Sequence, residues 1–282
     1  MSTPSRAVLI TGCSSGIGRA LALHLQRAGW AVYATARRPD SLADLAAAGC
    51  RTLALDVTNE ESMSQAVDAV EREAGAVGVL INNAGYSQSG AVEALPMDRV
   101  RRQFETNVYG PMRLCQLVLP GMRRQGWGKI VNISSIGGKL TFPGGGAYHA
   151  SKHAIEAFSD ALRFEVARCG VDVIVIEPGL IRTGFGDAVA AEMPDEPGPY
   201  AAFNAMVKQA TQEIYDKGPM AKLGGGPEAV ARVVLRALSA RRPKSRYAVT
   251  PSASLTLAMR RLLPDPLWDA MLRTMFPMPP IG

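Results

Sequence analysis

The chain has 282 residues, of which 47% are hydrophobic, so it can form one large α/β domain or two small ones with a sizeable core. Lys and Arg exceed Asp and Glu by 31 to 25, and the net charge of +6 permits attraction to anions without requiring nucleic acid. The arginine pairs are scattered without aromatic interleaving, which favours solvated helix ends over a nucleic-acid surface. No apolar run approaches the ~18 residues of a membrane span.

The cysteines and the N-terminus indicate a soluble, cytoplasmic protein. Cys13, Cys50, Cys115 and Cys169 lie far apart and show no metal-ligand spacing with the histidines. Free thiols in a reducing compartment fit this pattern best. Residues 7–10 are too short for the apolar region of a signal peptide and lead directly into a glycine loop. We expect no metal site.

Short apolar runs alternate with helical patterns up to about residue 180. The runs lie at residues 6–11, 31–35, 52–55, 77–81, 130–133 and 171–176. They are continuously apolar, which is typical of parallel strands covered on both faces. Thr58 and Glu61 have capping-box spacing for the helix after the third run. The pattern predicts an α/β fold, a doubly wound parallel sheet of the Rossmann type with helices on both faces.

A glycine loop follows the first run and opens the first helix. Glycines here let the backbone turn tightly and let a pyrophosphate approach free N–H groups at the helix N-terminus. No Lys-Ser/Thr pair follows the last glycine, which disfavours an NTPase. The sequence predicts a dinucleotide-binding loop that makes its contacts through Gly12, Ser14, Ser15, Gly16, Ile17 and Gly18.

Arg37 stands at the end of the second run, where NAD-binding loops carry an acidic residue for the ribose hydroxyls. An acid would repel a 2′-phosphate, whereas a guanidinium binds one well. We therefore predict NADP(H) rather than NAD(H) as the cofactor.

Tyr148 and Lys152 stand four residues apart, so on a helix they share one face. A phenol with a pKa near ~10 is a poor base at neutral pH unless a nearby positive charge favours the phenolate. We expect the Lys152 ammonium to lower the pKa of Tyr148. Because Tyr and Lys fall four apart often by chance, an exposed helical turn is the alternative on this spacing alone.

The sequence changes character after Pro178-Gly179. Residues 183–226 carry Pro and Gly signals around weakly helical segments, which suggests a substrate lid; its apolar residues include Phe185, Met193, Tyr200, Phe203, Met206 and Met220. A helix at 227–240 and a strand at 247–249 complete a domain of residues 1–250. Residues 251–282 form an apolar extension interrupted by prolines. It could cover the substrate cleft or a subunit interface, or lie on a membrane surface as a basic amphipathic helix.

In chain order the sequence carries Thr11-Gly12-x-x-x-Gly16-x-Gly18, Asn82-Asn83-Ala84-Gly85, Asn107, Ser135, Tyr148-x-x-x-Lys152 and Pro178-Gly179. With these motifs the chain resembles the short-chain dehydrogenase/reductase family over roughly residues 5–250. Within that family it looks most like the branch related to 17β-hydroxysteroid dehydrogenases and retinol dehydrogenases.

The resemblance implies four catalytic residues. Tyr148 would exchange a proton with the substrate oxygen. Lys152 would keep the phenol acidic and bind the nicotinamide ribose. Ser135 would hold the substrate oxygen, with Ser134 as the adjacent candidate. Asn107 would hold a water that links the lysine to solvent, unless it is simply a buried helical asparagine.

The resemblance also implies further cofactor contacts. Asp56 and Val57 would contact the adenine, although Asp56 could instead be only a helix-start residue. Asn82, Ala84 and Gly85 would line the adenosine side. The nicotinamide carboxamide would be held by residues of the sixth strand's end and the loop after it, namely Pro178, Gly179, Ile181 and Thr183.

We expect an NADP(H)-dependent carbonyl reductase or alcohol dehydrogenase with an apolar small-molecule substrate. The alternatives are a dinucleotide-sensing regulatory protein and an epimerase or dehydratase. The apolar lid and tail residues could equally be core or subunit interface. Steroid, retinoid, fatty acyl ketone and small aldehyde substrates all stay open. The resemblance implies a homodimer or homotetramer built on the helices around 96–126 and 148–169.

Overall fold

The structure is a computed structural model that describes residues 3–184, 186, 189, 191–194, 197–216 and 219–276. Its centre is a seven-stranded parallel sheet with the strand order β3-β2-β1-β4-β5-β6-β7. The strands are β1 (Ala7–Ile10), β2 (Ala31–Ala36), β3 (Arg51–Ala54), β4 (Val79–Asn82), β5 (Gly128–Ile133), β6 (Val171–Pro178) and β7 (Arg246–Val249). Each overlaps a strand predicted from the sequence, and the doubly wound parallel sheet is confirmed.

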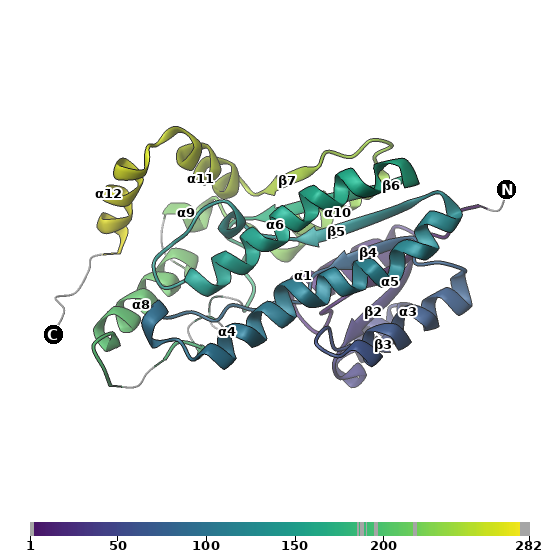
Figure 1. The fold of residues 1–282 in the computed structure, drawn as a ribbon, viewed down its shortest axis with the longest axis horizontal. Helices are drawn as coiled ribbons and strands as arrows, with labels where there is room; N and C mark the ends of the chain where they lie inside the picture. The colour runs from purple at the N-terminus through teal and green to yellow at the C-terminus, as the bar shows by residue number, and fades with distance from the viewer. Residues whose placement is uncertain are drawn as a thin grey trace.

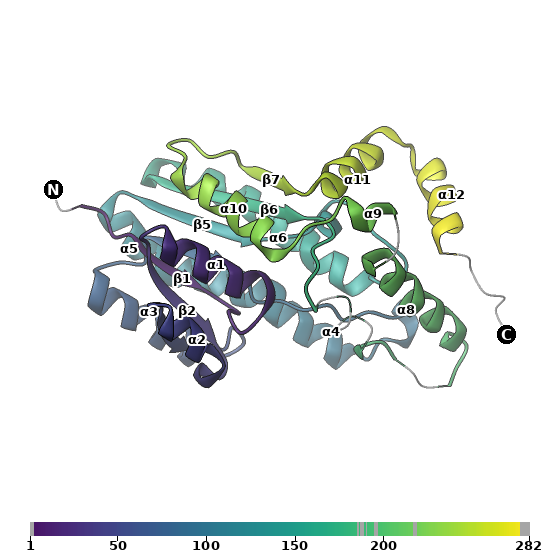
Figure 2. The ribbon, with the colours of Figure 1, turned by 180° about the vertical axis from the view of Figure 1, so that it is seen from behind.

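Helices cover both faces of the sheet. One face carries α3 (Glu60–Ala74), α5 (Gly110–Gln125) and α6 (Gly146–Val166), which lie in front of the sheet in Figure 1. The other face carries α1 (Gly16–Arg27), α2 (Ala43–Ala47) and α10 (Pro227–Ser239), as Figure 2 shows from behind. Short elements connect them: η1 (Pro39–Leu42), η2 (Val92–Ala94), α4 (Met97–Phe104), η3 (Glu105–Tyr109), η4 (Ile136–Gly138) and η5 (Ala167–Cys169).

The continuous apolar runs reflect burial on both sides of each central strand. In β1, Val8 and Ile10 belong to the core under α1 and α10, whereas Leu9 belongs to the core under α3 and α5. All three side chains are fully buried. A strand alternates its side chains between faces, so a strand between two helical layers must be apolar at every position.

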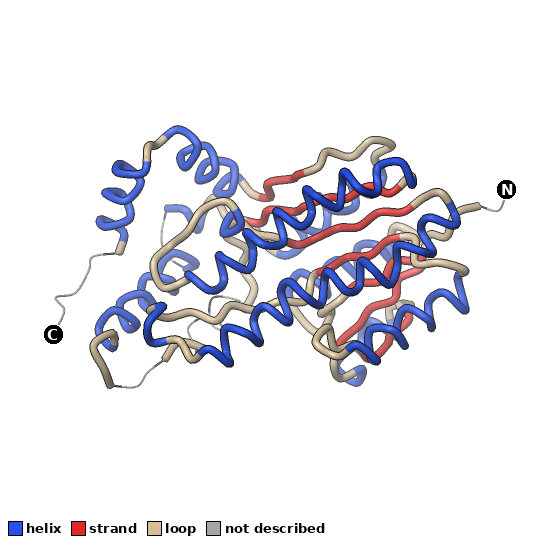
Figure 3. The backbone as a smooth tube through the Cα atoms, viewed as in Figure 1, coloured by secondary structure: helices blue, strands red, loops and turns tan. Residues whose placement is uncertain are grey.

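The carboxyl ends of the strands meet at one edge, and the loops that follow them collect there (Figure 3). The chain runs outward in opposite directions from β1 and β4, which are hydrogen-bonded neighbours. Ligands of open α/β sheets bind at such a switch point, outside the carboxyl ends of the strands. The sheet therefore places the glycine loop after β1 beside the Asn-Asn-Ala-Gly segment after β4.

The predicted capping box at Thr58 and Glu61 is wrong by one residue. The N-cap of α3 is Asn59, whose side chain accepts a hydrogen bond from the Ser62 N–H at 2.8 Å. Asp56 is the reason, because its carboxylate accepts from both the N–H and the hydroxyl of Thr58. The Thr58 hydroxyl is thus occupied in a turn before the helix begins.

The predicted lid contains α8 (Ala201–Asp216) and α9 (Pro219–Lys222). Asn204 on α8 accepts a hydrogen bond from the Ala91 N–H at 2.9 Å, which holds the helix to the loop after β4. A Cβ at Gly144 would come within 2.6 Å of Val207, so α8 also packs closely on the segment before α6. Phe185 and the side chain of Met220 lie outside the described residues.

The tail forms α11 (Pro251–Leu262) and α12 (Asp265–Met275), at the same end of the molecule as α8 (Figure 1). The helices separate at Pro264, as the prolines in the sequence indicated. Trp268 is buried and packs against Phe142, with ring centroids 6.4 Å apart. Residues 277–282 of the predicted extension lie outside the described residues. Within the described part of the chain, no helix is long and apolar enough to cross a membrane.

Candidate active site

The glycine loop after β1 is shaped to admit a close ligand. Gly12 and Gly16 have φ of +71° and +56°, which side chains rarely adopt. A Cβ at Gly18 would come within 2.2 Å of the Gly12 carbonyl oxygen, and one at Gly12 within 2.9 Å of Ala84. The predicted contacts Ser14 and Ser15 are exposed, and Ser15 makes no capping bond at the start of α1. These residues fit the pyrophosphate of a dinucleotide at an open helix N-terminus.

Thr11 and Asn83, which stand in the sequence motifs but were given no role there, brace this loop. The Thr11 hydroxyl accepts hydrogen bonds from the N–H groups of Asn83 and Ala84, at 3.0 and 2.9 Å. The Asn83 side chain donates to the carbonyls of Thr11 and Gly12, at 2.9 and 3.1 Å. The bonds tie the loops after β1 and β4 together.

The side chain of Asn82, predicted as a cofactor contact, points into the core. It is 4% exposed and donates to the Asn132 side chain at 2.9 Å, and Asn132 in turn donates to Ser159 on α6. Asn82 therefore links β4, β5 and α6. Ala84 lies against Gly12, and a Cβ at Gly85 would lie 3.1 Å from Asn107 and 3.7 Å from Lys152.

The rim beyond the glycine loop carries Arg37, Asp56 and Val57. Arg37 directly follows β2, is exposed, and has no ion-pair partner among the described residues. Asp56 is half-buried, and its carboxylate accepts hydrogen bonds from the N–H and the hydroxyl of Thr58 in the turn before α3. Val57 is buried in the core under α3 and α5.

Tyr148 and Ser135 meet at the carboxyl edge of the sheet. Ser135 follows β5 and caps η4, and its side chain hydrogen-bonds the Tyr148 phenol. Tyr148 lies in the first turn of α6 and is half-buried. Ser134 is directed elsewhere: its hydroxyl is buried, and a Cβ at Gly138 would come within 2.6 Å of it. The geometry therefore brings Ser135, and not Ser134, to the phenol.

Lys152 lies one turn after Tyr148 and is 7% exposed. Its Nζ donates a hydrogen bond to the Ile133 carbonyl at 2.9 Å and lies 5.8 Å from the centroid of the Tyr148 ring. Burial lowers the pKa of Lys152 to about 8, while the negative charge of Glu156 works in the opposite direction. Strongly shifted pKa values of this kind cluster at functional sites.

The expectation that Lys152 lowers the pKa of Tyr148 is wrong for this structure. Burial raises the pKa of Tyr148 to about 12, and the hydrogen bond from Ser135 opposes that rise. Loss of solvation for the phenolate outweighs the attraction of an ammonium that lies 5.8 Å from the ring centre. The phenol is consequently protonated at neutral pH.

Asn107 lies in η3, a single π-helical turn between α4 and α5. Its side chain donates to the Tyr86 carbonyl at 2.9 Å and to the Ser151 hydroxyl at 3.0 Å, and it accepts from the Tyr86 N–H. Ser151 in turn donates to the Tyr148 carbonyl at 2.7 Å. Asn107 therefore fixes the loop after β4 to the first turn of α6. Single π turns inside helices frequently occur at functional sites.

The segment Pro178–Thr183 closes the other side of the edge. Thr183 lies close to the glycine loop, since a Cβ at Gly16 would be 3.5 Å from it. Ile181 is buried and pairs with Gly225. Gly179 lies against the start of α11, where a Cβ would come within 2.7 Å of the Thr250 hydroxyl. The tail thus supports the turn after β6.

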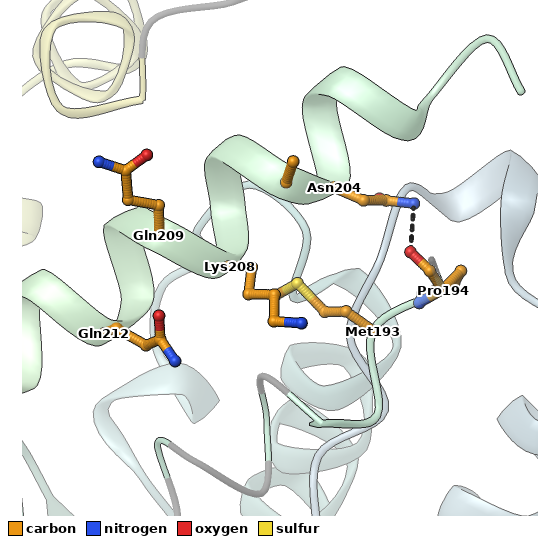
Figure 4. A pocket seen from close by; sticks show the side chains of 7 residues that line it. Met193, Pro194, Asn204, Lys208, Gln209 and Gln212 are labelled. Carbon is orange, nitrogen blue, oxygen red and sulfur yellow. Dashed lines mark hydrogen bonds between the residues drawn. The ribbon is translucent and has the colours of Figure 1, made fainter. Parts of the chain in front are cut away.

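A separate pocket lies within the lid (Figure 4) and does not contain the predicted catalytic residues. The Asn204 side chain spans its edge and donates to the Pro194 carbonyl at 3.4 Å. The pocket is lined by Met193, Pro194, Asn204, Ala205, Lys208, Gln209 and Gln212. Because no residue of the carboxyl edge lines it, we do not assign it to the hydride-transfer site.

The comparison with known families agrees with these features. The family model described as short chain dehydrogenase matches residues 6–194. The chain belongs to the short-chain dehydrogenase/reductase family and is an oxidoreductase, so the resemblance stated from the motifs is confirmed.

Individual relatives cover nearly the whole chain. It is 37% identical to the 3-ketodihydrosphingosine reductase of Bacteroides thetaiotaomicron, over 95% of this chain and 97% of the relative. It is 35% identical to the NADPH-dependent 3-dehydrocapnine reductase of Ornithobacterium rhinotracheale (94% and 95% covered) and 36% identical to human retinol dehydrogenase 5 (96% and 89%). A crystal structure of a short-chain dehydrogenase from Streptomyces avermitilis aligns with a TM-score of 0.80 at 36% identity, covering 96% of each chain.

Proposed function

We propose that this protein is an NADP(H)-dependent oxidoreductase that interconverts an apolar ketone or aldehyde and the corresponding alcohol, with Tyr148 as acid and base. The observation that carries the proposal is the hydrogen bond between Ser135 and Tyr148 with the Lys152 ammonium buried beside the ring. The bound nicotinamide supplies or accepts the hydride. The side chains hold the substrate oxygen and move its proton.

In the direction of reduction, Tyr148 donates its phenolic proton to the substrate oxygen while the carbonyl carbon gains hydride, so that C=O becomes CH–OH. A pKa of about 12 keeps the phenol protonated at neutral pH, which suits this role. The Ser135 hydroxyl holds the same oxygen without opposing its developing negative charge. Lys152 then stabilises the phenolate and would bind the ribose hydroxyls of the nicotinamide nucleotide.

Asn107 is proposed to connect this site to solvent. Its side chain is engaged with Tyr86 and Ser151, so a water that resupplies the proton would bind the backbone of the π turn. Lys152 lies close enough to take part, since the same Gly85 position approaches both Asn107 and the Lys152 Nζ.

The cofactor proposal rests on the glycine cradle and on Arg37. The open N-terminus of α1 fits the pyrophosphate, and the exposed Arg37 guanidinium is placed for a 2′-phosphate. The name of the NADPH-dependent 3-dehydrocapnine reductase supports the same choice. The proposed contacts are those predicted from the sequence, with Val57 and Asn82, whose side chains enter the core, limited to their backbones: Gly12, Ser14, Ser15, Gly16, Ile17, Gly18, Arg37, Asp56, Val57, Asn82, Ala84, Gly85, Tyr148, Lys152, Pro178, Gly179, Ile181 and Thr183.

An apolar substrate is supported by what surrounds Ser135 and Tyr148. Ile136 and Leu140, which follow Ser135, form an apolar cluster with Phe142 and with Trp268 of the tail. The names of the relatives that act on 3-ketodihydrosphingosine and retinol point the same way. We propose that residues 1–250 form the catalytic domain, that 183–226 form its lid, and that the tail borders the substrate cleft.

We further propose a homodimer or homotetramer in the cytoplasm. Phe164 on α6 is 90% exposed and Tyr109 at the start of α5 is 53% exposed, and both belong to the helices expected at the subunit interface. The described cysteines are free, which suits a reducing compartment.

Tyr148→Phe tests the mechanism. We expect turnover to fall about a thousandfold, since general acid–base catalysis is worth ~10²–10⁴, while the Kd for NADPH stays the same. The assay follows NADPH consumption with a panel of long-chain ketones, steroid ketones, decanal and retinal, and NADPH binding is measured by fluorescence. Unchanged turnover would refute the role of Tyr148, and a wild type that binds NADPH but reduces no carbonyl would favour a sensing protein.

A further inference from the structure

His149, directly after Tyr148 on α6, is buried against the turn that carries Ser135. Its side chain is 6% exposed and meets the Phe142 ring edge-on, with centroids 5.9 Å apart. Burial lowers the pKa of His149 to about 4, so the imidazole is neutral at physiological pH. A neutral imidazole has one N–H to donate and one nitrogen to accept.

The imidazole holds Gly137 in two ways. Its Nδ1 lies 3.2 Å from the Gly137 carbonyl oxygen, and because a carbonyl only accepts, Nδ1 carries the proton and donates it. The ring also packs on the Cα side of Gly137, where a Cβ would come within 2.4 Å of Nδ1. The contact joins two separate elements, α6 and η4, and is not one of the contacts between residues three or four apart within a helix.

Gly137 continues the chain of hydrogen bonds to Ser135. Its N–H donates to the Ser135 Oγ at 3.0 Å. The Ser135 hydroxyl also hydrogen-bonds the Tyr148 phenol. A hydroxyl has one proton and two lone pairs, so the Gly137 N–H occupies a lone pair and leaves the proton for the reacting oxygen. The bonds form a ring that closes through the peptide between Tyr148 and His149.

We propose that His149 is a positioning residue for Ser135: by holding the Gly137 backbone in place it keeps the serine hydroxyl pointing its proton at the reacting oxygen. The inference rests on the proposed function, since it gives His149 a role only where Ser135 and Tyr148 act.

His149→Phe removes the donor and keeps an aromatic ring of similar size. We expect kcat to fall about tenfold, because Ser135 is less well positioned once the hydrogen bond from His149 to Gly137 is lost. The Kd for NADPH and the KM for the carbonyl should change by less than about twofold. His149→Asn is expected to restore most of kcat, because its amide N–H can take the place of Nδ1–H. The matched control is His153→Phe, one turn further, where an exposed imidazole hydrogen-bonds the His149 carbonyl.

A double-mutant cycle with Ser135→Ala separates positioning from general damage. If His149 acts through Ser135, His149→Phe has no further effect on kcat once the hydroxyl is gone. Losses that multiply in the double variant would overturn the inference, as would a failure of His149→Asn to recover activity. If His149→Phe does not fold, Gly137→Ala tests the same link, because its Cβ displaces the imidazole, and it must likewise be silent in the Ser135→Ala background.

Tyr148→Phe, measured in parallel, distinguishes the two levels of the argument. Loss of turnover in Tyr148→Phe together with wild-type kcat in His149→Phe contradicts only the role of His149. Retained turnover in Tyr148→Phe, or a wild type without carbonyl reduction, contradicts the proposed function and the inference with it.

Discussion

Two halves of the site share one edge of the sheet but differ in how many charged groups they bury. The nucleotide half comprises residues 12–18 with Arg37. The chemical half comprises residues 134–152 with 178–183 and Thr250. In the nucleotide half the positive φ angles fall on glycines, and Ser14, Ser15 and Arg37 are exposed. The chemical half buries an ammonium at Lys152 and places a positive φ on a threonine. Holding an anion with backbone N–H groups costs the fold little, whereas tuning a proton transfer requires buried ionisable groups that destabilise it.

Replacing Lys152 gives the largest expected effect and tests that contrast directly. We expect Lys152→Met to reduce kcat about a thousandfold, because the phenolate loses its neighbouring cation. The same variant is expected to be more stable than the wild type at pH 7, by about 1 to 2 kcal/mol. Lowering the pKa of Lys152 from 10.5 to about 8 means that burying its charge destabilises the fold by roughly 3 kcal/mol. The variant removes this cost but leaves the Ile133 carbonyl without its hydrogen bond, which costs ~1–2 kcal/mol.

The pH dependence of unfolding identifies the cause. Between pH 8 and 10.5 the unfolded chain binds a proton at Lys152 that the folded chain has lost, so wild-type stability rises with pH in this window. Lys152→Met should lack that rise, whereas the exposed Lys244→Met should keep it. The measurement is urea unfolding from pH 7 to 11. Parallel curves for wild type and Lys152→Met would show that burying Lys152 does not lower stability.

Arg37→Ala probes the nucleotide half, with a smaller expected effect. Loss of a charge-assisted hydrogen bond of ~2–3 kcal/mol should raise the Kd for NADPH about 30- to 160-fold and leave the Kd for NADH unchanged. Stability should not change, because Arg37 is exposed and has no partner among the described residues. Arg27→Ala, at the far end of α1, is the matched control for the loss of one charge. A wild type that prefers NADH, or an equal loss for both cofactors, would contradict the assignment.

The sheet could be predicted from the sequence because each central strand is covered on both faces and is therefore a continuous apolar run. The sequence was less reliable at Asn82 and Asn83, which look equivalent in the motif. Strand alternation distinguishes them: Asn82 shares the face of Leu80, which packs under α3 and α5, so its side chain enters the core. The helix cap at Asn59 was missed because the competing turn at Asp56 depends on geometry rather than spacing.

The pair Tyr148 and Lys152 was visible as a spacing, but its pKa values were not. Burial sets both, and burial follows from how α6 packs on β5 and η4. The role of His149 was hidden for the same reason, since its partner Gly137 lies 12 residues earlier on another element. Long-range contacts of this kind leave no local periodicity in the sequence.

Thr250 gives the smallest expected effect and the most direct test of strain in the chemical half. Its φ of 89° is the only positive value at a non-glycine residue in the described part of the chain, and no turn motif in the sequence marks it. The residue caps α11 by accepting from the Ala253 N–H at 3.3 Å, and its hydroxyl lies against Gly179. Strain at such a φ is worth ~1–3 kcal/mol and the cap ~1 kcal/mol.

Thr250→Gly should therefore be about 1 kcal/mol more stable than the wild type, because glycine relieves the strain and sacrifices little of the cap. Thr250→Ala loses the cap and keeps the strain, so it should be about 1 kcal/mol less stable. At Thr256, inside α11, the order should reverse, since glycine is less favourable than alanine in a helix by ~1 kcal/mol. Urea unfolding of the four variants measures both differences. If Thr250→Ala is as stable as Thr250→Gly or more stable, the threonine is unstrained. The contrast between the two halves then rests on the buried charge of Lys152 alone.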